Sequence, residues 1–142
     1  MYNSMKLQFL SVAGNEQFAR MTASAFASQL NPSIEELSDI RVSVSEAVKN
    51  AIVHGYDARP DKQVTLWMEI ENDIITIVVS DLGRGIPDIE FATKPFYTSK
   101  PELEMSGMGF SVMQAFMDDV AIESTVGVGT AVTMRKRIRR AS

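Results

Sequence analysis

Glu46 and Asn50 form the first pair of residues in this sequence whose types and spacing could do chemistry. They lie four positions apart in a segment with helical spacing, so their side chains share one face of the expected helix. An amide oxygen is a ligand that Mg²⁺ accepts, and a carboxylate can take a proton from an attacking hydroxyl or water. A solvated polar stripe on an ordinary helix would look the same, and the pair taken alone favours that interpretation.

Asp81, Gly83 and Gly85 form a second candidate, directly after an apolar run that predicts a buried strand. A carboxylate at a strand end can accept a hydrogen bond from an amino group such as the exocyclic amine of adenine. The glycines let the backbone approach a flat base closely. An ordinary Asp-x-Gly turn explains these residues nearly as well. The sequence has neither the other motifs of eukaryotic-type kinases nor a Gly-x-x-x-x-Gly-Lys-Ser/Thr phosphate loop.

Gly107, Met108 and Gly109 form a third candidate, at the start of an expected helix. Backbone amides and the helix dipole favour phosphate at such a terminus, and glycines remove side chains that would block it. A fourth and weaker candidate is Thr130, whose hydroxyl could reach a bound base.

An irregular segment over residues 94–106 precedes the third candidate and contains Thr98, Ser99 and Lys100. These residues supply two hydroxyls and one ammonium group. Irregular stretches of this length inside a compact domain are more often functional lids than filler. We therefore expect the segment to cover bound phosphate.

The elements that must position these residues follow from periodicity and from helix start and stop signals. Ser33 and Glu36 form a capping box that opens the helix carrying Glu46, and Gly55 is its expected stop. Helices are expected at 15–30, 33–55 and 108–117, with a short helical stretch near 88–93, and strands around 6–9, 64–70, 74–80, 120–124 and 130–137. This order predicts a two-layer α/β (α+β) sandwich, in which helices cover one face of a mixed, mostly antiparallel sheet.

The first expected helix has Phe18, Thr22, Ala25 and Phe26 on one side. Arg20 is its single charged residue after Glu16. Arginine is favoured at interface centres, so Arg20 is a candidate for a partner surface, and its alternative role is that of a solubilising residue beside a dimer interface.

Charge and composition exclude several functions. The 142 residues include no cysteine and carry a net charge of −4, with 45% hydrophobic and 23% charged residues. Five of the fourteen basic residues lie within 135–140, so the preceding chain is strongly acidic and unsuited to nucleic acid. We expect the basic end to be a solvated strand end. No apolar run approaches the roughly 20 residues that span a bilayer, and no signal-peptide pattern begins the chain, so we expect a cytoplasmic protein without a membrane partner.

The four candidates in this order, on these element types, resemble the Bergerat (GHKL) nucleotide-binding fold over nearly the whole chain. Residues 45–56 and 100–110 look like the small stand-alone branch of that superfamily, the anti-sigma-factor serine kinases of sporulation. Histidine kinases of the superfamily carry a phospho-accepting histidine on a separate helix, whereas the single histidine here, His54, lies within the pocket helix.

The resemblance implies a role for each candidate. It makes Glu46 the general base, Asn50 the magnesium ligand and Asp81 the residue that reads adenine, with ATP and Mg²⁺ as cofactors. It makes the backbone of residues 107–109 the phosphate site and residues 94–107 the ATP lid. The family pattern has an arginine where Met105 stands, which leaves Lys100 as the cation of this segment.

The resemblance also implies partners for a single kinase domain spanning residues 1–142. These are a sigma factor of the sigma-F type, which is held inactive, and an anti-anti-sigma protein, which is phosphorylated on serine. It further implies a homodimer, with residues 1–30 as dimer or partner surface. Two other functions remain open: a nucleotide-gated binding module without useful phosphoryl transfer, and an ATPase that turns over without a partner.

Overall fold

The computed structural model describes residues 1–86 and 109–139. The short helical stretch expected near 88–93, the expected lid, residues 94–107, and the sequence-predicted Thr98, Ser99, Lys100, Met105, Gly107 and Met108 lie outside these ranges. The strands are β1 (Tyr2–Leu10), β2 (Gln63–Glu71), β3 (Ile74–Asp81), β4 (Asp119–Thr125) and β5 (Gly129–Arg137). The helices are α1 (Asn15–Ala27), α2 (Ile34–Asn50) and α4 (Gly109–Phe116), with a 3₁₀ turn at Ser28–Leu30 and a π-helical turn at Ala51–Gly55.

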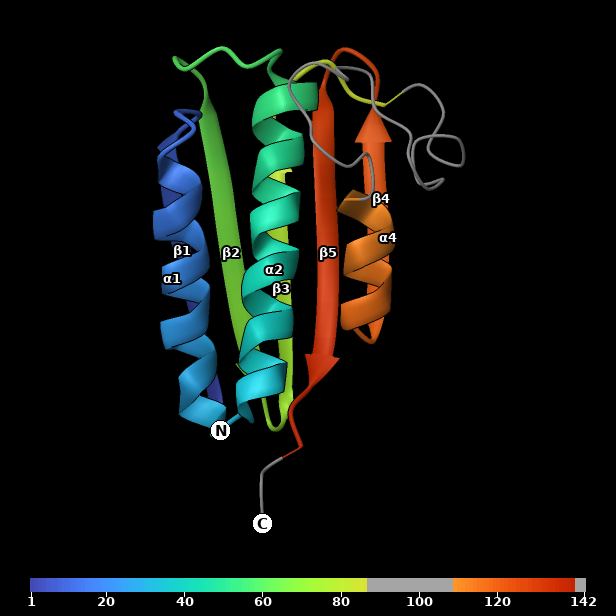
Figure 1. The fold of residues 1–142 in the computed structure, drawn as a ribbon. Coiled ribbons are helices and arrows are strands. Elements are labelled where there is room, and N and C mark those ends of the chain that lie inside the picture. Colours follow the sequence, from blue (N-terminus) through green and yellow to red (C-terminus); the bar gives the residue numbers. More distant parts are fainter. Residues whose placement is uncertain (87–108, 140–142) are drawn as a thin grey trace.

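The strands form one sheet in the order β1-β2-β3-β5-β4. Each neighbouring pair of described strands is antiparallel, so the sheet is more uniform than the mixed sheet that the sequence predicts. The helices α1, α2 and α4 lie side by side over one face of the sheet (Figure 1). The predicted two-layer α+β architecture is therefore confirmed.

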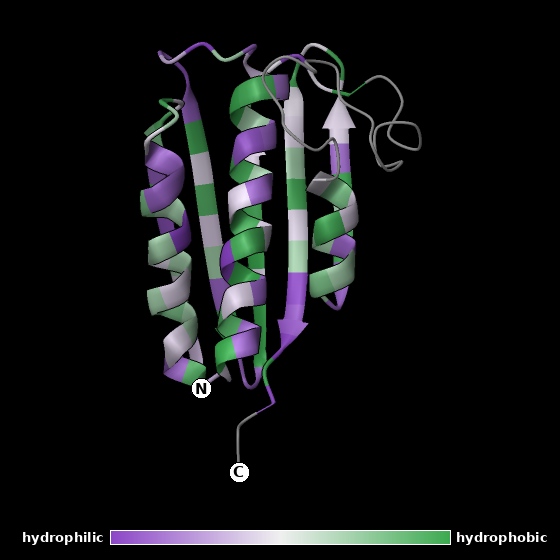
Figure 2. Ribbon diagram, in the orientation of Figure 1, coloured by the Kyte–Doolittle hydropathy of each residue, from purple (hydrophilic) through white to green (hydrophobic). Residues whose placement is uncertain are grey.

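The core lies between the helices and the sheet, and β2 shows how the sequence creates it. Its residues Val64, Leu66, Met68 and Ile70 are fully buried and alternate with partly exposed polar and aromatic residues. Figure 2 shows this alternation as bands along β2. Each such side chain stabilises the fold by about 1.5–3 kcal/mol when it leaves water.

The capping box at the start of α2 forms as predicted. The Ser33 hydroxyl accepts a hydrogen bond from the Glu36 amide at 3.0 Å, and Glu36 Oε1 accepts one from the Ser33 amide at 2.9 Å. Burial alone would raise the pKa of Glu36, but hydrogen bonds from the Arg139 and Ser33 amides hold this pKa below its ordinary value. The start of the pocket helix is thus fixed both locally and by Arg139, which follows β5.

The four residues that helical spacing places on one side of α1 do not form its buried face. Ala19, Ala23, Phe26 and Ala27 face the core, whereas Phe18 is 67% exposed. The small alanines let α1 lie close to α2 and the sheet, which turns the bulkier Phe18 outward. An apolar surface on α1 follows from this packing.

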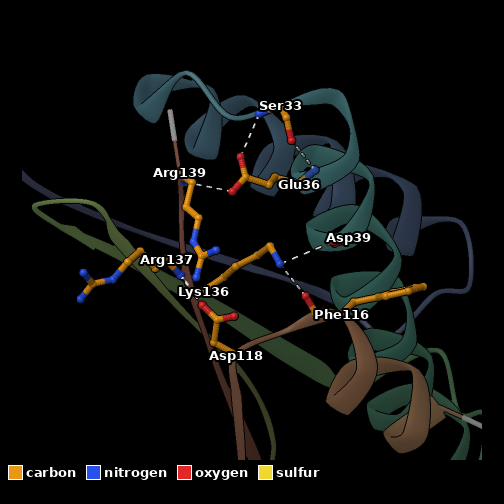
Figure 3. Close-up of polar contacts among 8 residues, drawn as sticks. All are labelled: Ser33, Glu36, Asp39, Phe116, Asp118, Lys136, Arg137 and Arg139. Atoms are coloured by element: carbon orange, nitrogen blue, oxygen red, sulfur yellow. Dashed lines mark hydrogen bonds and ion pairs between the residues drawn. The ribbon is translucent and has the colours of Figure 1, made fainter. Parts of the chain in front are cut away.

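The basic end of β5 is not simply a solvated strand end. Lys136 lies on the helix-facing side of the sheet and its side chain is 11% exposed. Its ammonium donates to the Phe116 carbonyl at 2.7 Å and lies 3.5 Å from Asp39 Oδ2, and the Arg139 amide donates to Glu36 Oε2 at 2.9 Å (Figure 3). The expectation was wrong here because alternation along β5 directs Lys136 toward α2 and α4.

No helix in the described part of the chain is long and apolar enough to cross a membrane.

Candidate functional site

The last turns of α2 bring Glu46 and Asn50 against the first residue of α4. A Cβ atom placed on Gly109 would lie 3.1 Å from Asn50 Nδ2 and 3.2 Å from Glu46 Oε2. Those distances are tighter than most Cβ contacts, so glycine keeps both polar groups close to the helix terminus. The predicted pair and Gly109 are therefore brought together, where backbone amides at the start of α4 favour an anion.

The Asn50 amide is available to a ligand. Within residues 1–86 and 109–139, Asn50 Nδ2 is one of two buried side-chain polar atoms without a hydrogen-bond partner. Leaving such a group unsatisfied costs about 1–3 kcal/mol. Because amide oxygen and nitrogen are assigned from their hydrogen bonds, either atom can face the site. A bound group that contacts this amide would recover the lost interaction.

This donor set fits Mg²⁺ when phosphate is also present. The described residues contain no cluster of three or more His, Cys, Asp or Glu side chains that could hold a metal alone. Mg²⁺ is often held by one or two protein oxygens, water and substrate phosphates. The amide of Asn50 beside the α4 terminus matches that requirement.

Asp81 ends β3 and is only 7% exposed. It is paired in register with Thr130 on β5, and its Oδ1 accepts a hydrogen bond from the Gly83 amide at 2.9 Å. Burial raises the pKa of this carboxyl, although hydrogen bonds from the Gly83 and Thr130 amides oppose the shift. A buried carboxyl with a raised pKa at the end of a strand is a candidate ligand-binding group.

The glycines predicted beside Asp81 are required by the protein's own packing. A Cβ atom on Gly83 would lie 2.0 Å from the Gly55 carbonyl oxygen. Gly85 has a φ of +77°, and a Cβ atom there would lie 2.5 Å from the Thr125 carbonyl oxygen. Both glycines therefore bring backbone segments together around Asp81, in addition to any contact with a flat ligand.

Gly55 is a site residue that the sequence indicates only as a helix stop. A Cβ atom on Gly55 would lie 2.8 Å from the Asp81 Cγ and Oδ1 atoms. It ends the π-helical turn Ala51–Gly55, a feature often found at functional sites. The turn also breaks the regular helical spacing that would place His54 on the line of Glu46 and Asn50.

Arg84 and Tyr56 hold this turn beside Asp81, and neither is identified by sequence reasoning. Arg84 Nε donates to the His54 carbonyl at 2.7 Å, and its amide donates to the Gly55 carbonyl at 3.0 Å. The Tyr56 hydroxyl accepts from the Leu82 amide at 2.6 Å and donates to the Gln63 carbonyl at 2.6 Å. Burial raises the pKa of Tyr56. These contacts join residues far apart in sequence, so no local motif indicates them.

Thr130 lies at the same end of the sheet as Asp81. Its hydroxyl is 2.8 Å from the Ser124 hydroxyl, and Ser124 Oγ also accepts from the Ile86 amide at 2.7 Å. Arg20 lies on α1, where its Nε atom is 3.7 Å from Glu16 Oε2, and it lines a groove together with Glu46.

The substitution Gly55→Ala should weaken nucleotide binding by about ten- to a hundredfold. The added methyl group would meet the Asp81 carboxyl at 2.8 Å, and overpacking of this kind costs about 1–3 kcal/mol. Calorimetric titration with ATP measures the effect. Gly14→Ala is the matched control, because a Cβ atom there meets nothing within 4 Å. Equal ATP affinities for the two variants would show that Gly55 does not position the site.

This fold, with the Glu46 carboxylate and the Asn50 amide paired on α2, indicates the class of domain to which the chain belongs. The sequence model of the histidine kinase-like ATPase domain matches residues 13–136. The chain thus has the fold of these ATPase domains.

Comparison with curated relatives identifies a family within this class of domain. The anti-sigma F factor of Clostridium novyi (strain NT) is 50% identical over 137 residues, which cover 96% of each chain. The anti-sigma F factor of Geobacillus kaustophilus is 50% identical over 140 residues, covering 99% of this chain and 96% of that one. The protein belongs to the anti-sigma F factor family.

A solved structure has the same fold. The RsbU and RsbW domains of a Mycobacterium tuberculosis protein superpose with a TM-score of 0.70 over 99% of this chain, at 17% identity. The chain spans 33% of that protein chain. At this identity the likeness concerns the fold alone.

Proposed function

We propose that the protein binds and inhibits a sigma factor of the sigma-F type and phosphorylates an anti-anti-sigma protein on serine, using Mg-ATP. The observation that carries the kinase activity is the position of Glu46. Its carboxylate lies against Gly109 at the start of α4, and it also lines a groove between α1 and α2. One carboxylate therefore lies between the helix terminus that we propose binds phosphate and a groove open to a partner.

The chain's own residues divide the work. Asp81 accepts a hydrogen bond from the adenine amine, and Thr130 lies beside the base. Asn50 would hold Mg²⁺ together with the phosphates, and a bound ion would supply positive charge against the charge that develops on them. Glu46 takes the proton of the attacking serine hydroxyl.

We place the remaining phosphate contacts outside the described residues. Gly107 and Met108 would contribute backbone amides, and Thr98, Ser99 and Lys100 would belong to a lid over residues 94–107. The activity would reside in one domain spanning 1–142, in the cytoplasm, where sigma factors act.

One experiment separates this function from its two alternatives. The protein is incubated with γ-labelled ATP, with and without the anti-anti-sigma protein. Label on a serine of that protein supports the kinase. Free phosphate without the partner would indicate an independent ATPase, and binding without transfer would indicate a nucleotide-gated module. Glu46 favours the kinase, because a pure binding switch needs no carboxylate beside the magnesium ligand.

The outward face of α1 is the proposed partner and dimer surface. Phe18 and Met21 are 67% and 56% exposed on this helix, and Arg20 and Met21 also line the groove beside Glu46. Aromatic residues and arginine are enriched at interface centres. This surface supports binding of the sigma factor, the anti-anti-sigma protein or a second copy of the chain.

The substitution Arg20→Glu should weaken binding of the sigma factor, the anti-anti-sigma protein or both by at least about 2 kcal/mol, the scale of a lost interface anchor. ATP affinity should not change, because Arg20 lies outside the residues around Asn50 and Asp81. Calorimetry measures all three affinities. Arg59→Glu is the control, since Arg59 is exposed and its guanidinium lies 3.1 Å from the equally exposed Asp61 carboxylate. Partner affinities within threefold of wild type would place the docking surface elsewhere.

A further inference from the structure

A groove of about 480 Å³ runs between α1 and α2 beside Glu46. Its lining comes from both helices and consists of Arg20, Met21, Ser38, Arg41, Val42, Ser45, Glu46 and Lys49. The Ser45 hydroxyl donates to Glu16 Oε1, which ties α2 to α1 at this point. The groove is therefore held in shape by a contact made one residue before Glu46.

Charge is segregated around this groove. The two helices carry five acidic residues (Glu16, Glu35, Glu36, Asp39 and Glu46) and three basic residues (Arg20, Arg41 and Lys49). All three basic residues line the groove, whereas Glu46 is the one acidic residue that does so. A cationic groove on an acidic helix pair, in a chain of net charge −4, is suited to an acidic ligand.

Three of the other four acidic residues on α1 and α2 contact basic or amide groups. Glu36 and Asp39 face the end of β5, where they meet the Arg139 amide and the Lys136 ammonium (Figure 3). Glu16 Oε2 lies 3.7 Å from Arg20 Nε and neutralises part of that charge. Arg41 and Lys49 are therefore the cations that give the groove its net positive character.

Arg41 and Lys49 lie on either side of Glu46 along α2. At a rise of about 1.5 Å per residue, Arg41 begins roughly 7.5 Å before Glu46 and Lys49 roughly 4.5 Å after it. An extended peptide advances about 3.3 Å per residue. A serine held at Glu46 would thus have the two cations within about three residues on either side.

We propose that this groove binds an acidic segment of the protein that is phosphorylated, and that Arg41 and Lys49 select acidic residues flanking the target serine. The proposal rests on the proposed kinase function, because it places the serine hydroxyl at Glu46. Under this proposal, residues of α2 determine which substrate segment is bound, and the partner surface on α1 makes a separate contribution to docking.

The test measures binding of the anti-anti-sigma protein by calorimetry in the presence of ADP. Arg41→Gln and Lys49→Gln should each weaken binding about three- to fivefold, and the double variant about tenfold or more, as expected for partly exposed charge pairs. The salt dependence of binding should become shallower in the double variant. Lys49→Arg keeps the positive charge and should bind the partner about as well as wild type does. The ATP affinity of all these variants should not change.

Lys62→Gln is the matched control, because it removes one exposed cation far from the groove in sequence. A second arm replaces the acidic residues that flank the partner's serine with amides. The altered partner should bind the wild-type protein more weakly than the unaltered partner does. The double variant, in contrast, should bind the altered and the unaltered partner with about the same affinity. Such non-additivity shows that the two charge sets contact each other.

A double variant that binds within twofold of wild type, with unchanged salt dependence, would overturn the proposal even if the partner is phosphorylated. Loss of binding in the double variant without any phosphoryl transfer by wild type would overturn the kinase and retain the groove as a binding site. Failure of wild type to bind this protein would overturn both.

Discussion

Replacing Glu46 with glutamine should lower phosphoryl transfer to the partner by about two to four decades, the range for a positioned general base. Glutamine keeps the size and hydrogen-bonding shape of glutamate, so the contact with Gly109 and the groove wall is retained. Only the proton acceptor is lost. Transfer is measured in single turnover with γ-labelled ATP, and ATP and sigma-factor affinities are measured by calorimetry and should stay close to wild type.

Glu35→Gln controls for the loss of one negative charge on the same helix, since Glu35 is exposed at the opposite end of α2. Near-normal transfer by Glu46→Gln would mean that the base lies elsewhere or that positioning alone carries the reaction.

Asn50→Ala should abolish magnesium-dependent ATP binding and leave the fold intact. Alanine has the highest helix propensity, and Asn50 Nδ2 makes no hydrogen bond within the described residues that the change would break. The free energy of unfolding should therefore stay the same or rise, because a buried unsatisfied group is removed. Calorimetry with Mg-ATP and with ATP in EDTA measures binding, and urea unfolding measures stability.

Asn3→Ala is the matched amide deletion, because Asn3 hydrogen-bonds the exposed Gln29 side chain at 2.9 Å, on another part of the molecule. Tight Mg-ATP binding by a folded Asn50→Ala protein would remove Asn50 as the magnesium ligand.

The elements of the fold could be predicted because their causes are local. The capping box of Ser33 and Glu36 and the alternation along β2 are visible in short windows of sequence, and both form as expected. The buried face of α1 could not be predicted because helix spacing alone does not decide between Phe18 and the small Ala19. That choice is made by close packing against α2 and the sheet.

The site was only partly predictable for a related reason. Glu46 and Asn50 are one turn apart, so their convergence follows from helix geometry. Gly55, by contrast, is needed because Asp81, 26 positions later, lies against it. Arg84 likewise acts on the carbonyls of His54 and Gly55. Contacts between distant segments have no local sequence pattern, and the π-helical turn that creates them is not marked by a distinctive residue.

The buried Asp81 carboxyl makes the free energy of unfolding depend on pH. Because its pKa in the folded chain lies above the ordinary value of 3.8, the folded protein holds this proton more tightly than the unfolded one. Stability from this group is therefore present at low pH and is lost as pH rises through the folded pKa. Above the folded pKa the ionised carboxylate opposes folding, and a hydrogen bond donated by the amine of bound adenine would offset that cost. Nucleotide binding would then stabilise the folded chain through the residue that we propose recognises the base.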